Sequence, residues 1–85
     1  MLNMTLIDLE KGEHGIVYSL KHNDFLLKLV EMGFYEGRMV SIEEYTSDKE
    51  TFCVSVSDSK IMLRKVEADS IMVQKCDIKA KLMNH

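Results

Sequence analysis

Apolar residues recur along this chain with two different periods, and the helical period is clearest in one short stretch. Leu26, Leu29 and Val30 have the spacing that lines one side of an α-helix, and Phe25 and Met32 extend that side. The pattern predicts a helix of about three turns. Such a short helix is not stable alone in water, so we expect it to pack against the rest of the protein.

Glycines mark the end of this helix and the turn that follows it. Gly33 falls where helices often end in a left-handed residue, a conformation that strains glycine least because it has no Cβ. Phe34 can then fold back onto the last helical turn, and Gly37 marks the next sharp turn. Asn23 or Asp24 offers the N-cap.

Elsewhere apolar and polar residues alternate, which is the period of a β-strand. The alternation is cleanest where Phe52, Val54 and Val56 share one side. The predicted strands are Gly15–Leu20, Met39–Tyr45, Thr51–Ser57, Lys60–Arg64 and Ile71–Gln74. Polar residues at 46–50 and 65–70 predict a loop and a short connection. We therefore expect a mainly β fold, a small five-stranded barrel with one short capping helix between the first and second strands.

Size and composition limit the classes of function. The chain has 85 residues, 46% of them apolar and 29% charged, which is typical of one folded domain without room for a large catalytic cleft. A net charge of -3 argues against nonspecific binding to nucleic acid. We expect a single domain over residues 1–75 and a C-terminal tail over residues 76–85, where the alternation is lost.

The cysteines and the N-terminus indicate a cytoplasmic protein. Cys53 and Cys76 are the two cysteines, they are not closely spaced, and no export signal precedes them. No stretch approaches the roughly twenty apolar residues that cross a bilayer, so we expect no direct membrane insertion.

The sequence offers no catalytic residue and predicts a protein that is not an enzyme. His14, His22 and His85 lack the spacing of metal ligands and are interpreted as surface residues. Glu43 and Glu44 are neighbours, so on a strand they point to opposite faces and cannot form an acid/base pair. We therefore predict no cofactor and no metal site.

Three methionines, Met39, Met62 and Met72, are out of phase with the inward residues of their strands. Outward apolar side chains of this kind indicate a partner surface or a weak contact between copies of the chain.

Several short motifs occur in a characteristic order between about Thr5 and Val73. They are Leu9, Lys11-Gly12, Gly15-Ile16, Met32-Gly33-Phe34, Gly37 with Val40, Ile61-Met62-Leu63-Arg64, Glu67-Ala68 and Ile71. With this order and spacing the chain resembles the FeoA family, small cytosolic accessory proteins of bacterial ferrous-iron uptake, and the related SH3-like domain at the C-terminus of iron-dependent repressors.

The resemblance implies an SH3-like fold and a nonenzymatic protein that docks on the cytosolic GTPase part of a ferrous-iron permease. An alternative is a detached metal-responsive regulatory domain of the iron-dependent repressor type. A third hypothesis, a binder of single-stranded nucleic acid, is disfavoured by the acidic charge balance.

We expect the docking surface to combine the helix, the turn after it and the loop at 45–50. Its predicted residues are Phe25, Leu26, Lys28, Leu29, Phe34, Tyr35, Glu36 and Arg64. Tyr35 is the expected anchor, since aromatic residues dominate interface energetics, although it can instead pack beneath the turn. Arg64 is either a finger inserted into the partner's site or a surface ion-pair partner of Glu67.

Overall fold

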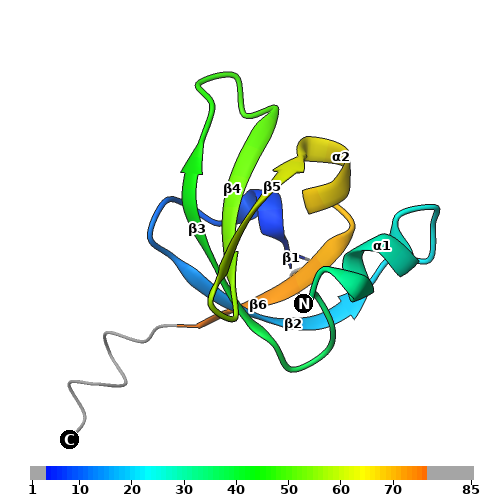
Figure 1. The fold of residues 1–85 in the computed structure, drawn as a ribbon. Coiled ribbons are helices and arrows are strands. Elements are labelled where there is room, and N and C mark those ends of the chain that lie inside the picture. Colours follow the sequence, from blue (N-terminus) through cyan, green and yellow to red (C-terminus); the bar gives the residue numbers. More distant parts are fainter. Residues whose placement is uncertain (1–3, 77–85) are drawn as a thin grey trace, which may run out of the picture.

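The computed structural model of this protein describes residues 4–76 and is mainly β-structure (Figure 1). The strands are β1 (Met4–Thr5), β2 (His14–Leu20), β3 (Met39–Tyr45), β4 (Thr51–Val56), β5 (Ser59–Arg64) and β6 (Ile71–Cys76). The helices are a 3-10 turn η1 (Leu6–Asp8), α1 (Leu26–Glu31) and α2 (Lys65–Ala68). The predicted fold class is confirmed.

The six strands form one antiparallel sheet in the order β1-β6-β2-β3-β4-β5. The register shifts at Tyr18 in β2 and at Glu43 in β3, and such bulges bend a sheet. Figure 1 shows the sheet strongly bent around its interior. Strands β1 and β5 are its two edges, and α2 packs against β4, β5 and η1 between them.

The concave side of the sheet holds the core. The burial of Thr51–Val56 alternates along the strand, as its sequence predicts, with Phe52, Val54 and Val56 inside. The fully buried side chains from other elements include Leu6, Leu9, Val17, Leu29, Phe34, Val40, Ile42, Leu63, Ile71 and Val73. Each strand from β2 to β6 contributes at least one fully buried side chain, so a single core supports the sheet.

Helix α1 ends as the glycine pattern predicts. Gly33 has a φ of 106°, its amide donates to the carbonyl of Val30 at 3.0 Å, and the amide of Phe34 donates to the carbonyl of Leu29 at 2.9 Å. These two bonds form a Schellman motif. Phe34 then folds back and is fully buried. The start of the helix differs from the prediction: the N-cap is Phe25, not Asn23 or Asp24, and α1 has six residues where about three turns were expected. Asn23 contributes outside the cap, since its side chain accepts from the amide of Phe25 at 2.9 Å.

Three short elements were not predicted. Strand β1 and η1 occupy the N-terminal segment, and residues 65–70, expected as a polar connection, contain α2. The sheet therefore has six strands instead of five, and α1 lies between its second and third strands. Strand β6 continues through Cys76, one residue past the predicted domain boundary, and the rest of the predicted tail lies outside the described residues.

A buried carboxylate links the two α-helices. Glu67 of α2 has a side chain that is 4% exposed, and its Oε2 accepts from Nζ of Lys28 in α1 at 2.6 Å. Its Oε1 accepts from the amide of Arg64 at 2.8 Å. Burial raises the pKa of Glu67, but these two hydrogen bonds outweigh it and hold the pKa below its ordinary value. We call this arrangement the Glu67 clasp.

We expect Gly33→Ala to lower the free energy of unfolding by about 1 to 3 kcal/mol, because an L-residue is strained at this positive φ. A Cβ at Gly33 would meet only Val56 at 3.8 Å, so the cost comes from the backbone and not from crowding. Urea unfolding measures it. The control Glu31→Ala, at an exposed position of the same helix, should have little effect; equal stability of Gly33→Ala and the wild type would contradict the prediction.

We expect Glu67→Gln to lower the free energy of unfolding at neutral pH by about 1 to 3 kcal/mol, because it weakens two hydrogen bonds to a buried charge. A depressed pKa stabilises the fold above the ordinary carboxyl pKa, and this stabilisation is lost as the pH falls through the folded-state pKa. The stability of the variant should therefore decline less in acid than that of the wild type. Urea unfolding across the acid range measures both effects.

The matched control is Glu44→Gln, which removes the exposed ion pair with Lys11. Exposed pairs contribute little to stability, so this variant should follow the wild type. If Glu44→Gln lowered the free energy of unfolding as much as Glu67→Gln does, the Glu67 clasp would stabilise the fold no more than an exposed ion pair.

Candidate functional site

The structure divides the predicted docking residues into surface and core. Leu29 and Phe34 are fully buried, so the prediction is wrong for their side chains: both pack in the core and neither reaches a docking partner. The reason is the length of α1, whose six residues offer few apolar positions to anchor it to the sheet. Phe25 and Leu26 are half-buried, and the exposed members of the set are Lys28, Tyr35, Glu36 and Arg64.

A groove of about 360 Å³ lies beside α1. It brings together Leu26 of the helix with Tyr35 and Glu36 of the following turn, three of the predicted residues. Leu20 and His22, at and after the end of β2, form another part of its lining. We call this feature the α1 groove.

Tyr35 stands on the surface and not beneath the turn. Its side chain is 44% exposed, and the Cζ atom of Arg38 lies 4.5 Å from the centroid of its ring. The turn at Gly37, with a φ of 90°, brings the two residues together. Stacking of a guanidinium on an aromatic ring restricts the motion of both groups. Sequence reasoning did not assign Arg38 a role, and its position next to Gly37 was the available signal.

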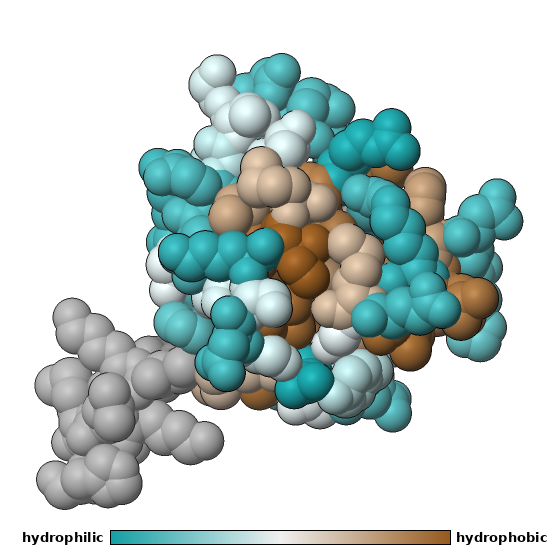
Figure 2. Space-filling view, viewed as in Figure 1, coloured by the Kyte–Doolittle hydropathy of each residue, from teal (hydrophilic) through white to brown (hydrophobic). Residues whose placement is uncertain are grey.

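Two apolar residues of α1 were not expected at the surface. Leu27 is 70% exposed and Val30, which was assigned to the packed side, is 39% exposed and lines the α1 groove. Figure 2 shows hydrophobic side chains reaching the surface on the side of α1, among hydrophilic ones. The signal for Leu27 was its place outside the i, i+3, i+4 pattern.

The loop at 45–50 is not part of this surface. Figure 1 shows the β3–β4 hairpin projecting away from α1. Tyr45 instead binds locally: its hydroxyl donates to Oε1 of Glu10 at 2.9 Å, which raises the pKa of Tyr45, and Nζ of Lys49 lies 4.8 Å from its ring centroid. The predicted surface is thereby restricted to α1 and its flanks.

Lys28 and Arg64 are joined through the Glu67 clasp. The ammonium group of Lys28 is engaged by Glu67, and Arg64 contributes its backbone amide to the same carboxylate. The ion pair expected between the Arg64 guanidinium and Glu67 is not present among the described residues. Glu67 instead accepts a hydrogen bond from the backbone amide of Arg64. The side chain of Arg64 is exposed next to α2.

Other candidate chemistry is dispersed. Within residues 4–76, no three His, Cys, Asp or Glu side chains gather in a way that could hold a metal ion. His14 and His22 lie near opposite ends of β2, and His85 is outside the described residues. Cys53 and Cys76 are half-buried free thiols. No helix in the described part of the chain has the length and apolar character needed to cross a membrane.

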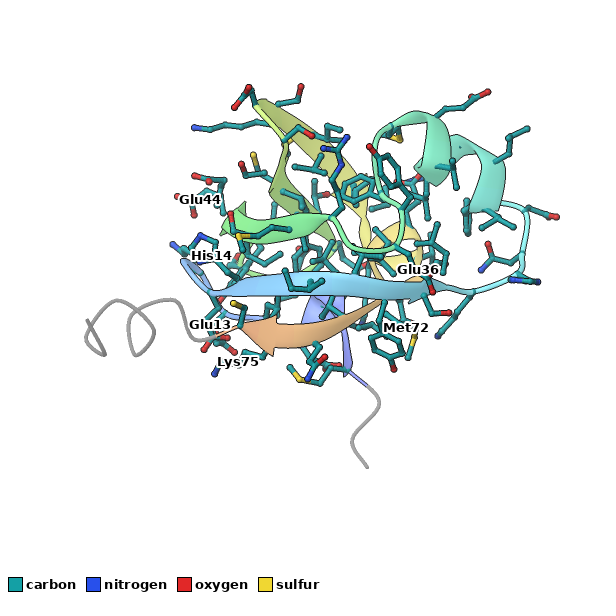
Figure 3. The ribbon with its side chains drawn as sticks, turned by 90° about the horizontal axis from the view of Figure 1, so that it is seen from below. Glu13, His14, Glu36, Glu44, Met72 and Lys75 are labelled. Carbon is teal, nitrogen blue, oxygen red and sulfur yellow. The ribbon has the colours of Figure 1, made fainter. Side chains whose placement is uncertain are left out.

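Of the three methionines predicted to point outward, two are exposed. Met39 is 43% and Met62 is 61% exposed, whereas Met72 is half-buried. Figure 3 shows Met72 on β6, on the same side of the molecule as Glu36.

Comparisons with known proteins agree with this architecture. The chain matches the FeoA domain over residues 4–75. The solution structure of iron(II) transport protein A from Clostridium thermocellum is similar with a TM-score of 0.79 at 30% identity, over 85% of this chain and 45% of that chain. This chain thus spans less than half the length of that relative. No curated protein sequence matches the chain.

Two further structures place the fold more broadly. The zinc complex of FeoA from Stenotrophomonas maltophilia, described as a procaryotic SH3-domain protein and a candidate ferrous-iron-transport activating factor, has a TM-score of 0.76 at 26% identity, over 84% of this chain and 89% of that chain. A manganese-dependent transcriptional repressor has a TM-score of 0.80 at 15% identity, over 89% of this chain and 42% of that chain, and shares the fold alone. Because the domain match extends through nearly all of the described sheet, this protein belongs to the FeoA domain family and has its small SH3-like fold.

Proposed function

We propose that this protein is a nonenzymatic cytoplasmic accessory of ferrous-iron uptake that docks on the cytosolic GTPase region of a ferrous-iron permease. The observation that carries the proposal is the FeoA domain match over residues 4–75. Relatives described as an iron(II) transport protein and as a candidate activating factor of ferrous-iron transport support it.

The α1 groove is the proposed docking site. Tyr35 and Leu26 supply aromatic and apolar contact area, and Glu36 supplies a charge at the edge. Aromatic residues held in place before binding lose little conformational entropy on association, and Arg38 holds Tyr35 in this way. Leu27 and Val30 extend the apolar surface along α1.

Lys28 and Arg64 flank the proposed site in different ways. The Glu67 clasp neutralises the charge of Lys28, so contact with a partner through its ammonium group would compete with the clasp. The side chain of Arg64 is exposed, and its guanidinium is available to an acidic group of the partner.

A detached regulatory domain of the metal-responsive repressor type is the second candidate. The similarity in fold to a manganese-dependent transcriptional repressor favours it. Equilibrium dialysis with Fe(II), Mn(II) and Zn(II) separates the two functions, because stoichiometric binding at micromolar concentration or tighter would favour the regulatory domain.

The direct test is calorimetric titration of the protein with the isolated cytosolic GTPase region of a ferrous-iron permease from the same source, with and without guanine nucleotide. We expect saturable one-to-one binding. Absence of binding to that region and to the whole permease at high micromolar concentration would refute the proposed function.

We expect Tyr35→Ala to weaken this binding roughly thirtyfold, which corresponds to about 2 kcal/mol, because it removes the aromatic anchor of the groove. The matched control is Tyr18→Ala, which removes a tyrosine that is 40% exposed, close to the 44% of Tyr35, but does not line the groove. The control should bind as the wild type does. Thermal melts of both variants show whether the fold is kept, and unfolding of Tyr35→Ala would assign Tyr35 a structural role instead.

A further inference from the structure

A second hollow, of about 320 Å³, lies on the side of the sheet turned away from the core. Its polar lining follows the strand register: His14 of β2 is opposite Ser41 of β3, which is opposite Ser55 of β4. Arg38 and Ser57 complete the polar part of the lining. Figure 3 shows His14 near one end of β2, far from Glu36 at the α1 groove. The two hollows are therefore distinct.

Arg38 lines this hollow and is the basic residue of its lining. Its Nε is buried and has no hydrogen-bond partner among the described residues. The guanidinium also stacks on Tyr35, which fixes the direction of its fork of donors.

Ser57 keeps a side chain at a position that suits glycine. Its φ is 54°, in the left-handed region, at the tight turn between β4 and β5. A residue that retains a Cβ there is strained, and the two-residue turn favours this positive φ. What serine provides and glycine lacks is a hydroxyl group in the lining of the hollow.

The lining of the hollow favours an anion, because it contains the guanidinium of Arg38. None of the described residues that line it is acidic. Lys60 of β5 is the cross-strand neighbour of Ser55 and continues the same row. The carboxylates of β3 lie beside lysines: Glu43 is 3.9 Å from Lys60, and Glu44 is 2.9 Å from Lys11. Their charges are partly compensated.

We propose that this hollow binds a phosphate group, free or as part of a small phosphomonoester. Arginine and several hydroxyl groups together form the donor set that suits the oxygens of phosphate. The volume is near the lower end of ligand pockets, about 300 to 1,000 Å³, so the ligand is small. Because Arg38 lines this hollow and Tyr35 lines the α1 groove, the bound phosphate also steadies the Tyr35 stack.

The test is titration of the ¹⁵N-labelled protein with inorganic phosphate, followed by amide chemical shifts. We expect saturable shifts at His14, Ser41 and Ser55, and much weaker binding of acetate, which is planar and carries less charge. A parallel titration with glycerol phosphate distinguishes the sources, because tighter binding than inorganic phosphate identifies a phosphomonoester as the preferred ligand. No saturable shifts with either phosphate compound in the millimolar range would overturn the proposal.

Ser57→Gly is the decisive variant, because it should raise the urea midpoint by relieving strain and yet weaken phosphate binding about tenfold by removing a donor. The matched control is Lys49→Gly, which relieves the strain of a φ of 57° outside the hollow. It should be stabilised too, but bind phosphate normally. Equal phosphate affinity in Ser57→Gly, Lys49→Gly and the wild type would contradict the assigned site.

Arg38→Lys tests the guanidinium while it keeps the positive charge. We expect roughly tenfold weaker phosphate binding, because lysine lacks the planar fork of donors that matches the oxygens of phosphate. Arg64→Lys, at the only other arginine of the chain and outside the hollow, is the control and should leave binding unchanged. Equal losses in both variants would show that the effect does not depend on a position in the hollow and would refute the site.

Discussion

The position of helix α1 depends on the carboxylate of Glu67, which is buried between the two α-helices. A buried charge is tolerated only when it is paired and hydrogen-bonded, and Glu67 meets this condition through Lys28 on one helix and the amide of Arg64 on the other side. α1 has only six residues and cannot be stable alone. The clasp therefore acts together with the burial of Leu29 and the Schellman turn to hold the helix on the sheet.

The shape of the surface beside α1 depends on this fixed position of the helix and on the turns that follow it. Gly33 and Gly37 set the path of the chain after the helix, and the stack of Arg38 on Tyr35 forms at the end of that path. Tyr35 of this stack lines the α1 groove, and Arg38 lines the polar hollow on the sheet. A ligand of one hollow and a partner in the other would thus meet the same pair of side chains, which gives the two proposed sites a physical means of influencing each other.

Local pattern predicted the longer strands and the end of α1 well because alternation and glycine chemistry act over a few residues, as at Thr51–Val56 and Gly33. It made α1 too long, since the helix has six residues and not about three turns. It missed β1, whose two residues are too few to show a period, and α2, a single turn that depends on hydrogen bonds to Glu67. It placed Leu29 and Phe34 on the docking surface although the same residues anchor the helix. The Arg38–Tyr35 stack and the His14–Ser41–Ser55 row depend on turn geometry and strand register, which spacing alone does not reveal.

The central claim is that the α1 groove is the face that meets the permease. Its most direct test is amide chemical-shift mapping of the ¹⁵N-labelled protein during addition of the unlabelled cytosolic GTPase region. The account predicts that the largest changes lie at Leu26, Val30, Tyr35 and Glu36, with little change in the β3–β4 hairpin around Tyr45. Saturable changes centred on that hairpin or on the edge strand β5, with the α1 groove unaffected, would contradict it.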